Sequence, residues 1–241
     1  MCTVTLVARR NGYALGMNRD EKLTRVAGLP PAQHRVAKRD ALFPSEPGGG
    51  TWIGVNDAGV TFALINWYSV NARVAGHALS RGEIVKAALS AASSSSVNAM
   101  FANTPLTSVN PFRLIGVFPA RRAVVEWRWN LEQLQRSEHG WQTRAWISSG
   151  FDEPGAQQTR GKIFAEALRQ KSIGSADWLR RLHRSHAPER GPYCHCMHRE
   201  DAATVSYTEV IVSLCIATVR YVADAPCSGV PAAVQRLETR P

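Results

Sequence analysis

The chain has 241 residues, of which 44% are hydrophobic and 20% charged, a composition that is ordinary for one large or two small globular domains. No apolar run approaches the roughly 18 residues of a membrane-spanning helix, and the first residues lack a secretory pattern, so we expect a cytoplasmic protein without integral membrane association. The formal net charge is +10, but the arginines that supply most of it are scattered, which argues against nucleic-acid binding.

The predicted elements begin with four extended runs, followed by a helical stretch at 81–92. Three more extended runs, helical stretches at 159–170 and 176–186, and two runs that alternate as a β-hairpin complete the chain. The extended runs are 3–8, 13–18, 51–55, 60–66, 112–118, 124–129, 143–148, 204–212 and 215–222. Because hairpins are frequent and the helices are grouped, we expect an α+β fold with antiparallel sheets. No long linker divides residues 1–241, so we expect a single domain.

The first two extended runs form a predicted hairpin that places charged residues beside the start of the chain. The dipeptide Asn11-Gly12 lies between them and favours a two-residue type I′ turn. Counting back from that turn places Cys2 opposite Glu21, and opposed side chains share a face. We therefore expect the segment 18–21, Asn-Arg-Asp-Glu, to lie beside Cys2.

Cys2 is the candidate nucleophile of this site. Five cysteines are an odd number and do not indicate a disulfide scaffold, so we expect reduced thiols. Once Met1 is removed, the α-amine of Cys2, with a pKa of about 7.7–8.0, can act as base on the same residue. Asp20 would hold that amine, and the positive charge of Arg19 would lower the pKa of the thiol. The alternative is that Cys2 is a small buried residue and Asp20 a carboxylate at the hairpin end.

Four motifs stand in order in the N-terminal half: Met1-Cys2-Thr3, the segment 18–21, the segment 49–54 (Gly-Gly-Thr-Trp-Ile-Gly) and the segment 63–66 (Ala-Leu-Ile-Asn). Together they resemble the NRDE proteins, a group that includes the transport and Golgi organisation protein 2 homologues of eukaryotes. The resemblance is strong over roughly the first 90 residues, faint from about 110 to 190, and moderate near the C-terminus.

The same half is similar, more distantly, to cysteine N-terminal-nucleophile (Ntn) hydrolases such as choloylglycine hydrolases and penicillin V acylases. That resemblance implies a four-layer αββα sandwich and cleavage of amide bonds by an N-terminal cysteine. By the same resemblance, Cys2 is the nucleophile, Asp20 anchors its amine, and Asn66 contributes to an oxyanion hole.

The chain departs from the hydrolase pattern at two positions. Met17 stands where those enzymes carry an arginine, and Arg19 is the candidate to replace its charge. Ser149 stands where a second asparagine is expected. Arg199 is the candidate for an arginine that a C-terminal strand lends to the pocket in those relatives.

Three further residues complete the predicted ligand contacts. Asn18 belongs to the motif beside Cys2, and Trp52 and Trp67 would flank the site as an aromatic wall for an apolar or planar ligand. We expect a small-molecule ligand that is anionic or amphiphilic.

Two functions follow. The first is an amidohydrolase or acyltransferase that acts on a small amide or acyl substrate and requires no cofactor. The second is a non-catalytic protein that binds or carries haem or another anionic amphiphile, since the resemblance to eukaryotic homologues implies haem movement and the chain is basic.

A Cys-His-Cys-Met-His run packs four potential metal ligands into residues 194–198. In a strand, Cys194, Cys196 and His198 would share one face, as a ligand group needs. A structural zinc site usually takes ligands from two separate segments, and only the isolated Cys215 and Cys227 could supply the second. Packing at a strand edge is the alternative, and we assign no metal site from the sequence.

Overall fold

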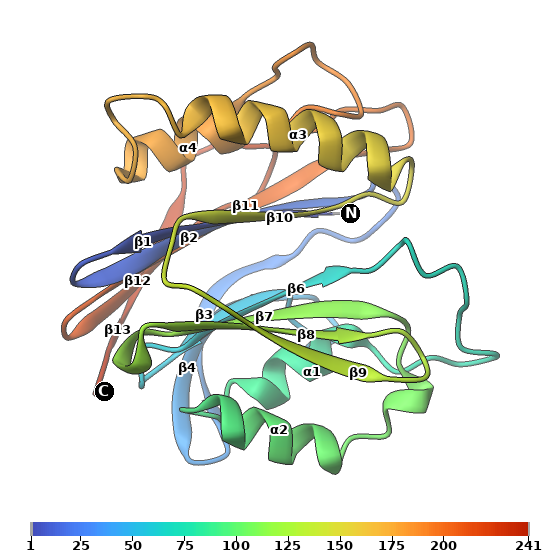
Figure 1. Cartoon of the computed structure of the whole chain (residues 1–241), viewed down its shortest axis with the longest axis vertical. Coiled ribbons are helices and arrows are strands. Elements are labelled where there is room, and N and C mark those ends of the chain that lie inside the picture. The colour runs from blue at the N-terminus through green and yellow to red at the C-terminus, as the bar shows by residue number, and fades with distance from the viewer. Residues whose placement is uncertain (1, 241) are drawn as a thin grey trace.

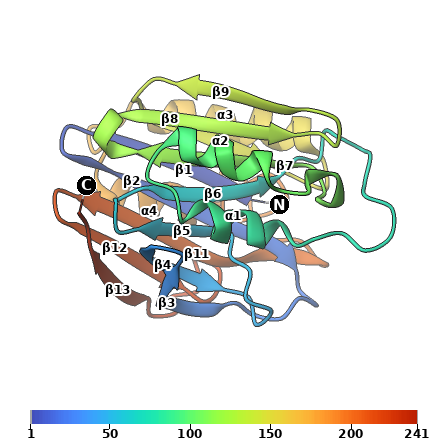
Figure 2. The same cartoon turned by 90° about the horizontal axis from the view of Figure 1, so that it is seen from below.

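The computed structural model describes residues 2–240 and has two antiparallel sheets stacked face to face, with helices on both outer faces (Figures 1 and 2). In spatial order, one sheet consists of β10 (Arg144–Ser148), β1 (Cys2–Arg9), β2 (Gly12–Lys22), β11 (Ala202–Ser213), β12 (Ile216–Val222) and β13 (Ala233–Glu238). The other consists of β3 (Leu29–Val36), β4 (Arg39–Ser45), β5 (Ile53–Asn56), β6 (Thr61–Asn66), β7 (Phe112–Phe118), β8 (Ala123–Trp129) and β9 (Leu134–His139).

Two pairs of helices form the outer layers. Helices α3 (Glu153–Ala167) and α4 (Ala176–Arg184) cover the six-stranded sheet, and α1 (Arg81–Ala88) and α2 (Ser94–Ala102) cover the seven-stranded sheet (Figure 1). This αββα arrangement confirms the predicted fold class. None of the helices within residues 2–240 combines the length and apolar character that crossing a bilayer requires.

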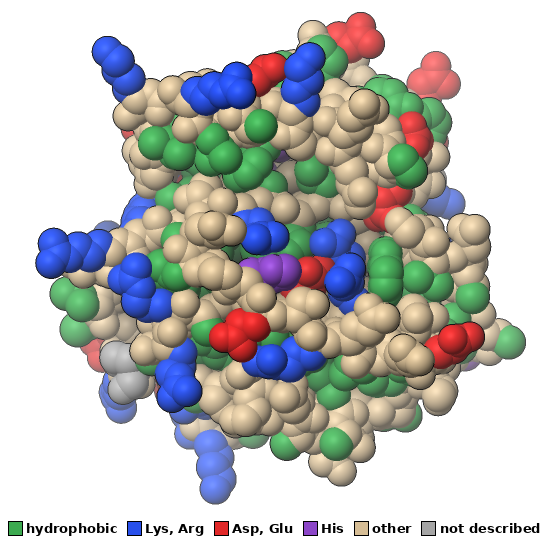
Figure 3. Space-filling model, in the orientation of Figure 1, with side chains coloured by type: hydrophobic (Ala, Val, Ile, Leu, Met, Phe, Trp, Pro, Cys, Tyr) green, Lys and Arg blue, Asp and Glu red, His purple; other side chains and the backbone are tan. Residues whose placement is uncertain are grey.

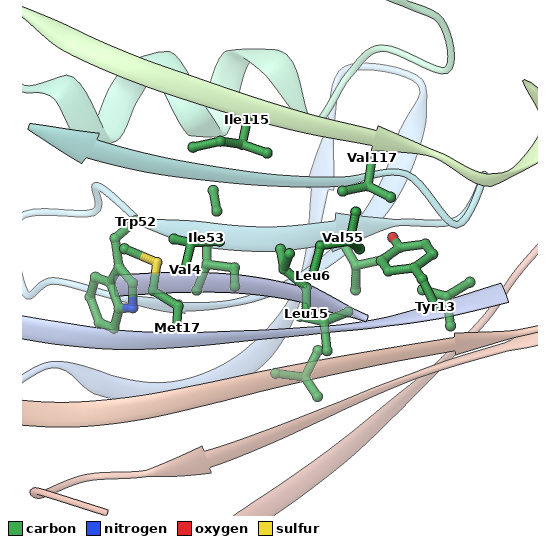
Figure 4. Close-up of a cluster of buried hydrophobic side chains, with 14 of the residues drawn as sticks. Val4, Leu6, Tyr13, Leu15, Met17, Trp52, Ile53, Val55, Ile115 and Val117 are labelled. Carbon is green, nitrogen blue, oxygen red and sulfur yellow. The ribbon is translucent and has the colours of Figure 1, made fainter. Parts of the chain in front are cut away.

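Alternation along β1 and β2 separates the two buried layers. Leu6, Leu15 and Met17 point between the sheets and pack with Ile53 and Ile115 in the main core (Figure 4). Burial of each such side chain contributes about 1.5–3 kcal/mol. Because neighbours along a strand point to opposite faces, the even-numbered positions of β2 face the layer of α3 and α4.

That outer layer is a smaller apolar cluster. Val7 of β1 and Ala14 of β2 pack there against Trp178, Leu179 and Leu182 of α4. The start of the chain is therefore buried on both faces of its sheet, with one face toward the opposite sheet and the other toward the helices.

The predicted register of the first hairpin is wrong by two residues. The turn occupies residues 10–11 rather than 11–12, because Gly12 already pairs with Arg9 as the first residue of β2. Gly12 has a φ of 110°, and a Cβ there would lie 2.0 Å from the carbonyl oxygen of Val212. The close approach of β11 therefore requires a glycine at position 12 in the observed register.

The shift changes the partner of the candidate nucleophile but not its face. Cys2 pairs with Arg19 instead of Glu21. Because side chains alternate with a period of two, a two-residue shift leaves every side chain on its predicted face. Cys2 and Arg19 therefore both lie on the face toward the opposite sheet.

Five elements that the sequence did not predict are present: β3, β4, β9, β13 and α2. Helix α2 begins within the serine run 93–96, because the Ser93 hydroxyl accepts a hydrogen bond from the Ser96 N–H and caps the helix. The prolines of β3 are tolerated because this strand lies at a sheet edge. The 194–198 run is irregular rather than a strand.

His183 of α4 is buried as a neutral imidazole. It is fully buried, and neither ring nitrogen has a hydrogen-bond partner among residues 2–240. Burial, helped by the charge of Arg160, lowers the pKa of His183 to about 3. An unfolded chain protonates this ring below about pH 6.5, so between that pH and about 3 only the unfolded state holds the proton. Stability is therefore lost as the pH falls through this window.

We expect acidification from pH 7 to pH 5 to cost about 2 kcal/mol of unfolding free energy through His183. His183→Leu should lose correspondingly less over the same range in urea unfolding experiments. The exposed His77→Leu is the control and should keep the wild-type pH dependence. Identical pH dependence in His183→Leu and the wild type would contradict a neutral buried ring.

Candidate functional site

A pocket of about 400 Å³ lies where β1 begins, β6 ends and α1 begins. Five of the residues predicted for the site line it: Cys2, Arg19, Asp20, Trp52 and Asn66. The remainder of its wall comes from the end of β2 and the residues after it, the segment before β5, β6, the residues around the start of α1, and Asn110. The structure thus brings together residues that are up to 64 positions apart in the sequence.

Cys2 is the first residue of β1 and lies at the wall of this pocket, with a paired strand on each side. It pairs with Arg19 on one side and with Ser148 of β10 on the other, and its exposed fraction is 8%. Burial raises the pKa of the Cys2 thiol, as does the negative charge of Asp20, whereas the Asp20 N–H and the charge of Arg19 oppose the rise. The net shift is upward, so the resting thiol is neutral at pH 7. A base must take its proton before it can attack.

Asp20 is fixed on the opposite face of the sheet from the Cys2 side chain. Its carboxylate accepts hydrogen bonds from Arg160 of α3 (3.1 Å) and from the Thr204 hydroxyl of β11 (2.6 Å). The side chains of Asp20 and Arg160 are both completely buried. Arg160 also donates to the Thr3 hydroxyl at 2.7 Å, so one guanidinium ties β1, β2 and α3 together.

Arg19 is neutralised within the pocket wall. Its guanidinium lies 4.5 Å from the centroid of the Trp52 ring and donates to Glu46 at 2.5 Å. Glu46 also accepts from Arg25 at 2.8 Å. The positive potential that Arg19 offers to Cys2 is therefore shared with a carboxylate, in keeping with a thiol pKa that stays raised.

Asn66 and the first turn of α1 form the other wall. The Asn66 amide donates to the Tyr68 hydroxyl at 2.8 Å. A Cβ on Gly82 would lie 2.9 Å from the Cα of Gly50, so α1 approaches the glycine-rich loop more closely than any side chain would permit. This contact gives a physical reason for the Gly-Gly-Thr-Trp motif and for a glycine early in α1.

Asn18 and Ser149 do not line the pocket. The Asn18 amide is buried in the helix layer, where it donates to the carbonyl oxygens of His183 (2.9 Å) and His195 (2.7 Å). Its even position in β2 sends it to that layer. The Ser149 hydroxyl accepts the N–H of Phe151 at 3.3 Å, in the turn that leads into α3.

Trp67 and Arg199 also lie outside the pocket wall. The Arg128 guanidinium stands 5.7 Å from the centroid of the Trp67 ring. Arg199 pairs with its neighbour Asp201 at 2.7 Å and stacks on the Phe151 ring at 4.5 Å. The structure therefore does not bring Arg199 to the pocket wall, because the Asp201 carboxylate and the Phe151 ring hold its side chain elsewhere.

Three residues that the sequence did not single out belong to the site. Arg160 holds Asp20, Ser148 is the strand partner of Cys2, and Arg81 lines the pocket. The spacing of Arg160 indicates a buried charge, because it follows Ala156 by four residues and shares its buried face of α3. A charge in that position needs a partner. Arg81 belongs to the Ser-Arg-Gly-Glu segment 80–83, which opens a predicted helix, whereas Ser148 carries no comparable signal in the sequence.

The charges of the pocket wall balance in number. Three arginines and three carboxylates line it: Arg19, Arg25, Arg81, Asp20, Glu21 and Glu46. Among the described residues, Arg81 makes no ion pair and donates only to the Pro111 carbonyl, at 3.2 Å. Burial lowers the pKa of Arg81. The face drawn in Figure 3 shows lysine and arginine side chains dispersed rather than gathered into one patch.

Arg160→Met is expected to destabilise the fold by about 3–5 kcal/mol, because it leaves the buried Asp20 carboxylate without its counter-charge. Urea unfolding measures the loss. The matched control is Arg169→Met, an exposed arginine just beyond α3, which should change stability by no more than about 0.5 kcal/mol. Adding Asp20→Asn to Arg160→Met should restore part of the loss. A cost for Arg160→Met no larger than that of the control would refute a structural ion pair.

Comparison with solved structures shows the fold. Two crystal structures of variants of the conjugated bile acid hydrolase from Clostridium perfringens align with TM-scores of 0.54 at 8% identity; one covers 96% of each chain, the other 100% of this chain and 97% of the hydrolase. Penicillin V acylase from Agrobacterium tumefaciens aligns with a TM-score of 0.47 at 11% identity, over 99% of this chain and 91% of the acylase. The chain therefore has an Ntn-hydrolase fold.

Sequence comparison gives the family. No curated protein sequence matches the chain. The family profile described as Transport and Golgi organisation 2 matches residues 1–141, which is more than half of the chain and includes every predicted element of the pocket wall. The NRDE resemblance of the N-terminal motifs is thereby confirmed, and the chain belongs to the Transport and Golgi organisation 2 family.

Proposed function

We propose that this protein is a cysteine Ntn amidohydrolase or acyltransferase, in which Cys2 attacks the acyl carbon of a small amide or acyl substrate. The observation that carries the proposal is the position of the Cys2 thiol, in the wall of a pocket that Asp20 and Asn66 also line. The fold supports it, because the structural neighbours with the same layers include a hydrolase of conjugated bile acids.

Proton transfer is the first step of the proposed reaction. Removal of Met1, which lies outside the described residues, frees the α-amine of Cys2. With the thiol pKa raised by burial, the amine takes the thiol proton as the sulfur attacks. Asp20 then holds the ammonium group, and Arg160 and Thr204 keep its carboxylate in place.

Acyl transfer follows on the sulfur. A C–S bond forms and the carbonyl π pair moves to oxygen, where the Asn66 amide, and the Ser148 hydroxyl beside Cys2, are the candidate donors. The Ser148 hydroxyl is buried and has no hydrogen-bond partner among residues 2–240, so it is available for this task. Collapse breaks the C–N bond, and the leaving amine takes the proton from the α-ammonium. Water then releases the acid, or an acceptor amine takes the acyl group.

A small activated ester is expected to acylate Cys2, and the adduct should appear on the N-terminal peptide in mass spectrometry. The experiment is best done in Cys215→Ser protein, because Cys215 is an exposed thiol that would react on its own. The intact mass of the same sample reports whether Met1 is removed. Cys2→Ala should abolish the adduct.

Acylation of Cys215→Ser protein that persists after Cys2→Ala would exclude Cys2 as the nucleophile. Retained Met1 in an otherwise folded, unreactive protein would exclude the α-amine as the base. A processed protein that forms the adduct and releases it as the free acid would support hydrolysis over simple binding.

We propose as the second candidate a non-catalytic role in binding an anionic amphiphile such as haem. The observation that favours it is Arg81, a pocket cation without an ion pair among the described residues. A bound carboxylate would supply the missing partner, and the Trp52 indole would contact an apolar, planar body.

Haemin is the probe for this alternative. A titration should give a saturable shift of its absorption band, and Arg81→Gln should weaken binding by about tenfold or more, since a hydrogen bond to a charged group contributes about 1.5–3 kcal/mol. The exposed Arg10→Gln should bind as the wild type does. The absence of a shift at micromolar haemin, or equal affinities of Arg81→Gln and the wild type, would count against this role.

We propose the cytoplasm as the location. All five cysteines are free thiols, although the exposed Cys215 and the half-buried Cys227 are accessible to an oxidant. Persistence of free thiols is favoured in a reducing compartment.

A further inference from the structure

Four cysteine and histidine side chains from three segments converge away from the pocket. His186 follows α4, Cys196 and His198 lie in the irregular stretch before β11, and Cys227 follows β12. One potential ligand atom from each residue lies within 4.8 Å of all the others. This set consists of two thiols and two imidazoles, the donor composition of many structural zinc sites.

The distances from His198 to the other three ligand atoms fit tetrahedral coordination. His198 Nε2 lies 3.2 Å from His186 Nε2, 3.5 Å from Cys196 Sγ and 3.4 Å from Cys227 Sγ. Zinc–nitrogen bonds of about 2.0–2.1 Å and zinc–sulfur bonds of about 2.3 Å at tetrahedral angles place ligand atoms roughly 3.3–3.8 Å apart. Three of the six pairs of ligand atoms therefore have the spacing that a single ion would impose, and the other three pairs lie within 4.8 Å.

Hydrogen bonding does not account for this arrangement. A ring nitrogen such as His198 Nε2 has either one proton or one lone pair, both in the ring plane, so it can make one good hydrogen bond. Three atoms lie within 3.5 Å of this nitrogen, one each from His186, Cys196 and Cys227. An ion at the centre of the cluster satisfies all four donor atoms at once.

We propose that His186, Cys196, His198 and Cys227 form a four-coordinate site for Zn²⁺. Four protein ligands leave no open position, so the ion is structural rather than catalytic. Binding converts both thiols to thiolates and releases two protons, and the dipositive ion is neutralised by the two sulfurs. The site is independent of the function proposed for the pocket.

Zinc binding requires one change around the cluster, at the contact between Arg190 and His198. Arg190 approaches His198 Nδ1 at 3.3 Å, and a neutral ring that binds metal through Nε2 carries its proton on Nδ1. Two donors cannot face each other, so the exposed Arg190 side chain moves away when the ion binds. Cys194 is not a ligand, because its thiol donates to the Gly191 carbonyl at 3.2 Å, and Cys215 is remote and exposed.

The ion would stiffen the support of the buried Asp20 carboxylate. Met197, between the ligands Cys196 and His198, accepts the Thr204 N–H at 2.8 Å and donates its own N–H to the Thr204 hydroxyl at 2.9 Å. The same hydroxyl donates to Asp20. A metal ion bound by Cys196 and His198 would therefore restrain Met197 and, through it, Thr204, which positions Asp20.

The experiment loads untagged full-length protein with Zn²⁺, removes excess ion by gel filtration and measures zinc by mass spectrometry. We expect one ion per chain in the wild type and in the matched control Cys215→Ser, and loss of most of it in Cys227→Ser and His186→Ala. Replacement of zinc by Co²⁺ should give thiolate-to-cobalt charge-transfer absorption that Cys227→Ser reduces. Chelation should lower the Tm of the wild type and of Cys215→Ser by at least about 5 °C.

Folding of each variant is checked by circular dichroism, and both substituted ligands, His186 and Cys227, are half-buried rather than core residues. Zinc-free wild type after loading, or zinc retained in full by both ligand variants, would overturn the proposal. A thiol titration that finds two thiols missing in metal-free protein would assign Cys196 and Cys227 to a disulfide instead, which also overturns it.

Discussion

The buried ion pair of Asp20 and Arg160 is the constraint on which the candidate site depends. Both side chains are completely excluded from solvent, and they connect β2 of the sheet to α3 of the covering layer. A buried charge without its partner costs several kcal/mol, so neither residue can be displaced without disturbing the other. Thr3 and Thr204 extend this contact to β1 and β11. The position of the Asp20 carboxylate is therefore set by four elements from both ends of the chain.

Strand alternation places the Cys2 and Asp20 side chains in different layers of the fold. Cys2 and Arg19 face the opposite sheet, while Asp20 faces the helices, and only at the end of the strands do both border the pocket. This separation keeps the carboxylate away from the side of the sheet where the thiol lies.

Sequence comparison recognises the N-terminal half of the chain but not most of the C-terminal half. The family match ends at residue 141, yet Arg160, Thr204 and the cysteine–histidine cluster all follow it. The C-terminal half thus supplies the support of Asp20, while the N-terminal half supplies the residues that line the pocket. The proposed zinc site lies in the C-terminal half, so a bound ion would stabilise the part of the fold that follows the family match.

The sequence by itself determined the fold class, the family, and the residues of the first strands that meet at the pocket. Hydrophobic alternation and the short motifs are local, so Cys2, Arg19, Asp20, Trp52 and Asn66 could be found without coordinates. Tertiary structure decided the hairpin register, in which Gly12 lies against β11, and the positions of Asn18 and Arg199, which contact His183 and Phe151 from distant parts of the chain. It also decided that Cys196 and His198 meet His186 and Cys227 rather than Cys194 or Cys215, because packing of the loops after α4 and β12 brings distant ligands together. Local periodicity carries no information about which loops will touch.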